Sequence, residues 1–192
     1  QSRPGYRGTA LYYLNELGVA LVYPNIRGST GYGRTYLSLD DTLKREDAVK
    51  DVGAVLDWVA KSDRLDGRRV AVYGGSYGGY AALAGVTFTP ELYCCAINYV
   101  GVSDLNLITS WARGRAGRGS DMFYREWVGD DKEYKFNRSP LNFVERIRVP
   151  TLVLNARNDP FLPEAALVAA TRRVSPSVAL EQPRGGGHVG FL

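Results

Sequence analysis

Histidine and cysteine are scarce in this chain of 192 residues, which contains one histidine and two cysteines. Any chemistry that requires an imidazole must therefore use His188. The two cysteines, Cys94 and Cys95, are neighbours in the apolar stretch YCCAINYVGV, and successive side chains of a strand point to opposite faces. A disulfide between them would require a severe distortion, so we expect two reduced thiols. Reduced thiols suit a reducing compartment and favour a cytoplasmic protein.

Long apolar runs and strong charge are also missing. No run approaches the ~20 residues of a membrane-spanning helix, and no signal peptide opens the sequence, so we expect no membrane association. The net charge of +4 is modest. The sequence has no zinc-finger spacing, recognition-helix signature or interleaved aromatic and basic residues, so we expect neither a nucleic-acid partner nor a metal site.

Short apolar runs alternate with amphipathic segments along the chain. The runs that predict buried strands are residues 18–28, 66–75, 93–102, 149–157 and 177–183. The segments that predict helices are residues 45–61, 77–88 and 163–174. This alternation predicts an α/β fold with a mainly parallel sheet and helices on both faces. We expect one domain over residues 1–192, with a lid-like insertion at about 103–138 above the carboxyl edge of the sheet.

A serine stands at the centre of a glycine cluster in the stretch VAVYGGSYGGY, residues 70–80. Ser76 and its neighbours match G-x-S-x-G between a predicted strand and a predicted helix, which is the context that this nucleophile motif requires. Glycine at both flanking positions lets strand and helix approach at a strained turn. The alternatives are a glycine-rich turn or a phosphate-binding loop. The Walker G-K-[ST] signature is absent and the glycines miss the G-x-G-x-x-G spacing, so the pattern favours a nucleophile.

A serine hydroxyl needs a base, and His188 lies in GGGHVGF, just after the last predicted strand. The carboxylate that orients the histidine should come between the two, in the order Ser…Asp…His. Asp159 in LNARNDPFLP follows the fourth predicted strand and is the preferred candidate, whereas Asp104, after the third, is the alternative. The backbone N–H of Tyr77 is the expected first oxyanion donor.

Aromatic side chains are frequent in the predicted insertion. They are Trp111, Phe123, Tyr124 and Trp127. These side chains either line an apolar substrate pocket or pack the insertion onto the domain. The sequence leaves both interpretations open.

Four stretches, NIRGSTGYG, REDAVKDVGAVLDWV, VAVYGGSYGGY and SPLNFVERIRVPTL, together resemble the carboxyl-terminal catalytic domain of the prolyl oligopeptidase family of serine peptidases. The acylaminoacyl-peptidase and dipeptidyl-peptidase-like branches are the most similar. The resemblance implies an α/β-hydrolase fold and cleavage of peptide or acyl-amide bonds in short substrates without a cofactor. It assigns the nucleophile to Ser76, the acid to Asp159 and the base to His188.

The chain also departs from that family. The His-Gly-Gly-Pro-type segment of the oxyanion region would precede Gln1. We expect these 192 residues to contain neither an amino-terminal β-propeller nor the early strands and the terminal helix of the catalytic domain. The tail LNARNDPFLP…PRGGGHVGFL looks more like an esterase-type α/β-hydrolase. We therefore predict a serine hydrolase acting on short peptides or acyl-peptides. The alternatives are a carboxylesterase with the same triad, or an inert hydrolase-fold fragment that serves as an interaction module.

Overall fold

The computed structural model describes residues 2–3, 5, 8–115, 127–162, 167–168 and 170–188. The chain divides into two compact units, Gln1–Gly67 and Arg68–Leu192, each held together by its own internal contacts. The expectation of a single domain over residues 1–192 stays a prediction.

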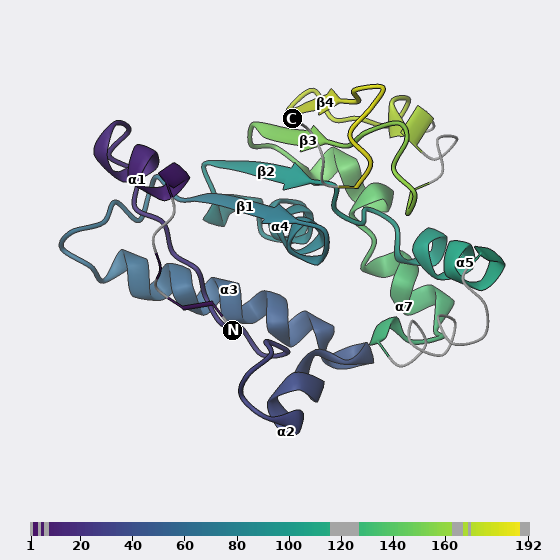
Figure 1. Cartoon of the computed structure of the whole chain (residues 1–192), viewed down its shortest axis with the longest axis horizontal. Helices are drawn as coiled ribbons and strands as arrows, with labels where there is room; N and C mark the ends of the chain where they lie inside the picture. Colours follow the sequence, from purple (N-terminus) through teal and green to yellow (C-terminus); the bar gives the residue numbers. More distant parts are fainter. Residues whose placement is uncertain are drawn as a thin grey trace. The chain divides into compact units, whose positions relative to one another are not determined.

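A parallel four-stranded sheet is the frame of the second unit (Figure 1). Its strands lie in the order of the sequence: β1 (Ala71–Gly75), β2 (Cys95–Tyr99), β3 (Thr151–Leu154) and β4 (Val178–Glu181). The last residues of the four strands lie opposite one another, so all four carboxyl ends meet at one edge of the sheet. The predicted strands from residue 66 onward are confirmed, and each is shorter than its apolar run.

Helix α4 (Tyr77–Phe88) follows β1 after one residue and packs against β1 and β2. It begins and ends where the sequence predicts. Eight of its twelve residues are buried, as expected for a helix that is apolar on every side. A short 3-10 helix, η3 (Pro90–Leu92), leads from α4 to β2. The reduced state predicted for Cys94 and Cys95 is confirmed, because both are free.

The predicted insertion carries helices α5 (Leu105–Arg115) and α7 (Lys132–Asn137), followed by the 3-10 helix η4 (Pro140–Arg146). Two of its apolar side chains, Leu105 and Val128, pack with Tyr80 and Ala84 of α4 in a buried cluster. The insertion is therefore anchored on the helix that follows Ser76. A lid-like role for residues 103–138 stays a prediction.

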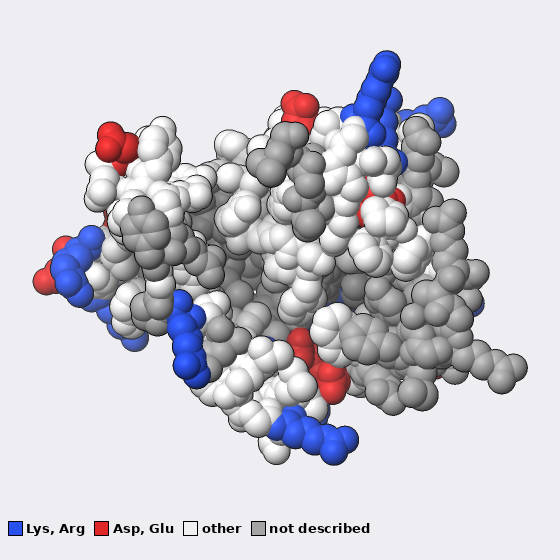
Figure 2. Space-filling view, viewed as in Figure 1, with Lys and Arg blue, Asp and Glu red and all other residues white. Residues whose placement is uncertain are grey.

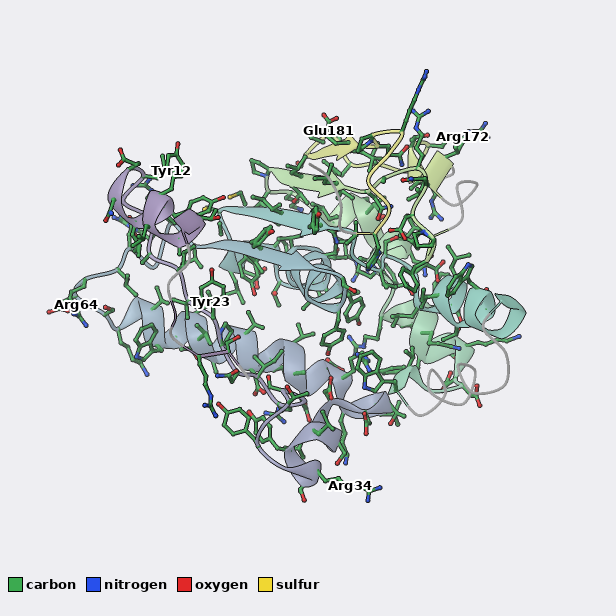
Figure 3. The ribbon with its side chains drawn as sticks, in the orientation of Figure 1. Tyr12, Tyr23, Arg34, Arg64, Arg172 and Glu181 are labelled. Atoms are coloured by element: carbon green, nitrogen blue, oxygen red, sulfur yellow. The ribbon has the colours of Figure 1, made fainter. Side chains whose placement is uncertain are left out.

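The first unit is helical. It contains α1 (Gly8–Asn15), α2 (Arg34–Leu37), η1 (Ser38–Asp40), η2 (Thr42–Lys44) and α3 (Arg45–Ala60). Helix α3 confirms the helix predicted over residues 45–61. Helix α1 buries none of its residues, and Tyr12 extends away from it with 55% of its surface exposed (Figure 3).

The strand predicted at residues 18–28 is wrong, because the structure assigns no strand to these described residues. Val19, Val22 and Tyr23 are 43–51% exposed instead of buried. A strand forms only where a neighbouring strand exchanges backbone hydrogen bonds with it. Among the described residues of its own unit, this segment has no such neighbour. Apolar composition alone does not supply that neighbour.

The helix predicted at residues 163–174 lies partly outside the described residues, which omit 163–166 and 169. Residues 167–168 and 170 are helical, and the chain turns from Thr171, earlier than predicted. Among the described residues, no helix combines the length and the apolar character needed to cross a membrane. Figure 2 shows basic and acidic side chains interspersed on the visible face, with no broad patch of one sign in the part that is described.

Candidate active site

Ser76 occupies the single position between β1 and α4. Its backbone has φ 52° and ψ −117°, a region that residues with a side chain rarely adopt. Two hydrogen bonds hold it there: the Ser76 N–H donates to the Tyr99 carbonyl at 2.9 Å, and the Tyr80 N–H donates to the Ser76 carbonyl at 3.1 Å. The tight turn predicted from the glycine pattern is therefore present, with the serine at its tip.

The glycines around Ser76 serve different purposes. A Cβ atom on Gly74 would overlap the carbonyl group of Gly78, and one on Gly79 would lie 2.6 Å from the Cα atom of Gly101. A Cβ atom on Gly78, in contrast, would meet nothing within 4 Å. Close packing thus requires glycine at positions 74 and 79. The expectation that both flanking positions of the motif lack a side chain for the same reason holds for Gly74 and not for Gly78.

A buried asparagine on β2, which the sequence analysis did not single out, ties the turn to the sheet. Asn98 is 1% exposed; its Nδ2 donates to the Gly79 carbonyl at 2.9 Å and its Oδ1 accepts from the Gly101 N–H at 3.1 Å. The signal was a polar residue inside the apolar run YCCAINYVGV. Buried amides persist where both polar ends find partners, so Asn98 fixes the first turn of α4 against the end of β2.

The loops after β3 and β4 bring Asp159 and His188 to Ser76. His188 Nδ1 lies 3.0 Å from Asp159 Oδ2, and His188 Nε2 lies 3.3 Å from Ser76 Oγ. The Asp159 side chain is fully buried, while 22% of the His188 side chain is exposed. An ionised carboxylate only accepts hydrogen bonds, so Asp159 favours the tautomer with the proton on Nδ1. Nε2 is then free to accept the hydroxyl proton of Ser76.

Asp159 has further donors besides the histidine. Its Oδ1 accepts from the Phe161 N–H at 2.8 Å, and its Oδ2 from Asn155 Nδ2 at 3.3 Å. The alternative carboxylate, Asp104, instead caps α5 by accepting from two backbone N–H groups of that helix, at 2.8 and 3.0 Å. The structure thus brings Asp159 to the histidine and uses Asp104 as a helix cap.

The other predicted site residues are only partly described. Tyr77 is the first residue of α4, and N–H groups in the first turn of a helix point toward its N-terminus, where Ser76 lies. The Trp127 ring lies 5.9 Å from the Tyr77 ring, and the Trp111 ring lies 5.7 Å from that of Phe161. Phe123 and Tyr124 lie outside the described residues.

The Cys95 thiol does not compete for this chemistry. Burial raises the pKa of the Cys95 thiol, and the neighbouring Cys94 adds to the effect. A thiol with a raised pKa stays protonated and is a poor nucleophile. Among the described residues, no three His, Cys, Asp or Glu side chains gather as a metal site requires.

Known proteins are similar to this chain in sequence and fold. A sequence model described as the prolyl oligopeptidase family matches residues 4–190. Dipeptidyl aminopeptidase BIII of Pseudoxanthomonas mexicana is 34% identical over 169 residues, which are 84% of this chain and 24% of that protein. The acylamino-acid-releasing enzyme of Mus musculus is 30% identical over 159 residues, 78% of this chain and 21% of that protein.

A crystal structure of puromycin hydrolase superposes with a TM-score of 0.74 at 31% identity, covering 87% of this chain and 25% of that one. The chain therefore spans about a quarter of the length of these relatives. The α/β-hydrolase fold implied by the resemblance is confirmed, and the chain belongs to the prolyl oligopeptidase family.

Proposed function

We propose that this chain is the catalytic part of a serine hydrolase that cleaves peptide or acyl-peptide bonds of short substrates through an acyl-enzyme. One observation carries the proposal: His188 lies within hydrogen-bond distance of both Ser76 Oγ and Asp159 Oδ2. Hydrolysis by a serine requires a nucleophile, a base and an acid in this relation. Names of the relatives, a dipeptidyl aminopeptidase and an acylamino-acid-releasing enzyme, support peptides and acyl-peptides as the substrate class.

The chemistry follows from these three side chains. Ser76 Oγ attacks the substrate carbonyl carbon while its proton passes to His188 Nε2. When the tetrahedral intermediate collapses, His188 returns that proton to the leaving amine, and the acyl group stays on Ser76. A water molecule, deprotonated by His188, then hydrolyses the acyl-enzyme and restores the serine hydroxyl.

Two further groups lower the barrier in this mechanism. Asp159 keeps the proton of the neutral imidazole on Nδ1 and stabilises the imidazolium that forms after proton transfer. The Tyr77 N–H, at the positive end of the α4 dipole, stabilises the oxyanion of the tetrahedral intermediate. We propose that Trp111 and Trp127 line an apolar pocket for the substrate.

Labelling with a fluorophosphonate probe tests the nucleophile. We expect labelling at Ser76, none in Ser76→Ala, and a labelling rate lowered by about 10²-fold or more in His188→Ala, because the serine loses its base. Ser62→Ala, which changes a serine of the first unit, is the control and should label like the unchanged protein. Absence of labelling in a folded sample would instead favour the inert interaction module.

Substrate choice separates the peptidase from the carboxylesterase. Turnover of an aminoacyl anilide and of a short-chain aryl ester should both be measurable, and a pure ester preference would favour the carboxylesterase.

A further inference from the structure

The segment that carries His188 has a backbone with many accessible conformations. Gly185, Gly186 and Gly187 precede the histidine, and the last two have φ values of 137° and 57°. Glycine loses more conformational freedom on ordering than any other residue. An imidazole at the end of such a segment therefore needs contacts that hold it in the orientation required for proton transfer.

Among the residues that the structure describes, backbone-to-backbone hydrogen bonds hold only the beginning of this segment. Beyond the end of β3, the Asn155 N–H donates to the carbonyl of Glu181, the last residue of β4, at 3.0 Å, and the Arg157 N–H donates to the Pro183 carbonyl at 2.9 Å. These bonds continue the ladder between the two loops up to Pro183, which precedes the glycines. Side chains that follow Arg157 in the loop after β3 contact the rest of the segment.

Asn158 contacts the residue directly before the histidine. Its Oδ1 accepts a hydrogen bond from the Gly187 N–H at 2.8 Å. The asparagine itself is exposed, so this bond adds little to the packing of the domain. Its position gives it a specific effect, because it fixes the backbone from which the imidazole projects.

Phe161 contacts both the acid and the base. Its N–H donates to Asp159 Oδ1 at 2.8 Å, and its ring centre lies 4.7 Å from that of His188 with an interplanar angle of 67°. The Trp111 ring of α5 packs against the Phe161 ring in turn. Edge-to-face contacts of this kind favour one relative orientation of two rings.

We propose that Asn158 and Phe161 are positioning residues that hold the His188 imidazole between Asp159 and Ser76, an inference that rests on the proposed function. Asn158 fixes the backbone before the histidine, and Phe161 fixes the plane of its ring. Without either contact the imidazole spends a smaller fraction of time in the reactive orientation, and kcat falls in proportion to that fraction. KM changes little, because neither residue is assigned to substrate binding.

Steady-state kinetics on the anilide substrate test this inference. We expect kcat to fall about threefold to tenfold in Asn158→Ala and in Phe161→Leu, with KM nearly unchanged. Asn158→Asp keeps an acceptor for the Gly187 N–H and should retain the kcat of the unchanged protein. Phe161→Tyr keeps the ring and should also recover kcat. Arg157→Ala, an exposed change in the same loop, is the control.

NMR of the imidazole provides a readout independent of turnover. The chain has one histidine, so the imidazole gives one set of ring signals without assignment by mutation. In the unchanged protein the nearby Phe161 ring changes the chemical shifts of these signals, and Phe161→Leu should remove that change. Asn158→Ala should shift or broaden the signals by admitting other orientations, whereas Arg157→Ala should leave them unchanged.

The outcomes separate this inference from the proposed function. A fall in kcat together with altered imidazole signals, in variants whose thermal unfolding matches the control, supports the inference. Unchanged kcat, or lowered kcat with unchanged imidazole signals, overturns it. If the unchanged protein does not react with the fluorophosphonate, the proposed function fails, while the NMR signals still report whether the two contacts hold the ring.

Discussion

At the scale of single residues, two of the three described non-glycine residues with a positive φ lie at the turn that carries Ser76. Ser76 has a positive φ, and so does the buried Val100, with φ 48°. Val100 directly follows Tyr99, whose carbonyl accepts the hydrogen bond from the Ser76 N–H. Strained residues persist only where their surroundings overdetermine them. Here the contact between Gly79 and Gly101 and the amide of Asn98 supply those surroundings.

A pair of alanine substitutions in α4 tests this close contact. In Gly79→Ala the new methyl group would lie 2.6 Å from the Cα atom of Gly101, so backbone must move, and we expect a loss of about 1–3 kcal/mol in the free energy of unfolding. Gly78→Ala meets open space, and alanine is the better helix former, so stability should stay the same or rise. Urea unfolding measures both. Equal stability of the two variants would contradict the argument.

At the scale of secondary-structure elements, the parallel strands assemble the site. Ser76 follows β1, Asp159 lies in the loop after β3 and His188 in the loop after β4. Because the strands end in register, the loops after them start at one edge of the sheet. Open parallel sheets bind their ligands at this edge. Residues separated by 112 positions in the sequence thus come within hydrogen-bond distance.

In the first unit, an ion pair joins the loop before α2 to helix α3. The Arg27 guanidinium and backbone N–H donate to the Asp51 carboxylate at 2.6–3.0 Å, which lowers the pKa of Asp51. A lowered folded-state pKa contributes stability above the unfolded value and loses it as the pH falls through the folded value. This contribution should therefore be present at neutral pH and disappear in acid.

Asp51→Asn tests that pH dependence. The variant should unfold at a lower urea concentration than the unchanged protein at pH 7, and the difference should shrink once the pH falls well below 3.8, the usual pKa of aspartate. Asp57→Asn, an exposed change on the same helix, is the control. A difference between Asp51→Asn and the unchanged protein that stays constant from pH 7 to a pH well below 3.8 would contradict the assigned sign.

At the scale of the whole molecule, the two outer strands of the sheet differ. Strand β4 carries Glu181, a charged side chain at its end (Figure 3). Strand β1 consists of the uncharged residues AVYGG, and 69% of Tyr73 is exposed. Natural sheets blunt open edges with charge or proline, because an uncharged edge can pair with another chain. Within the described part of the sheet, β1 is the outer strand that has neither a charged residue nor a proline.

We therefore expect a purified protein of this sequence to associate in a concentration-dependent manner through β1. Tyr73→Lys places a charge on this strand and should lower the association measured by light scattering coupled to size-exclusion chromatography. Tyr12→Lys, on the exposed surface of α1, adds the same charge elsewhere and is the control. The explanation fails if both variants associate as the unchanged protein does.

Local structure around Ser76 followed from the amino-acid sequence alone. The β1–Ser76–α4 turn was predictable because glycines and apolar residues restrict the backbone within a few positions of each other. The imidazole was predictable by elimination, since the chain has one histidine. Family membership was predictable from separate stretches in the right order.

Tertiary structure decided what depends on neighbours distant in the sequence. It brought Asp159 rather than Asp104 to His188, placed Asn98, Asn158 and Phe161 around the site, and left residues 18–28 without a strand. The sequence shows which side chains are able to form hydrogen bonds or ion pairs. The alignment of the strands determines which partner each side chain contacts. A carboxylate therefore becomes an orienting group or a helix cap according to the loop that carries it.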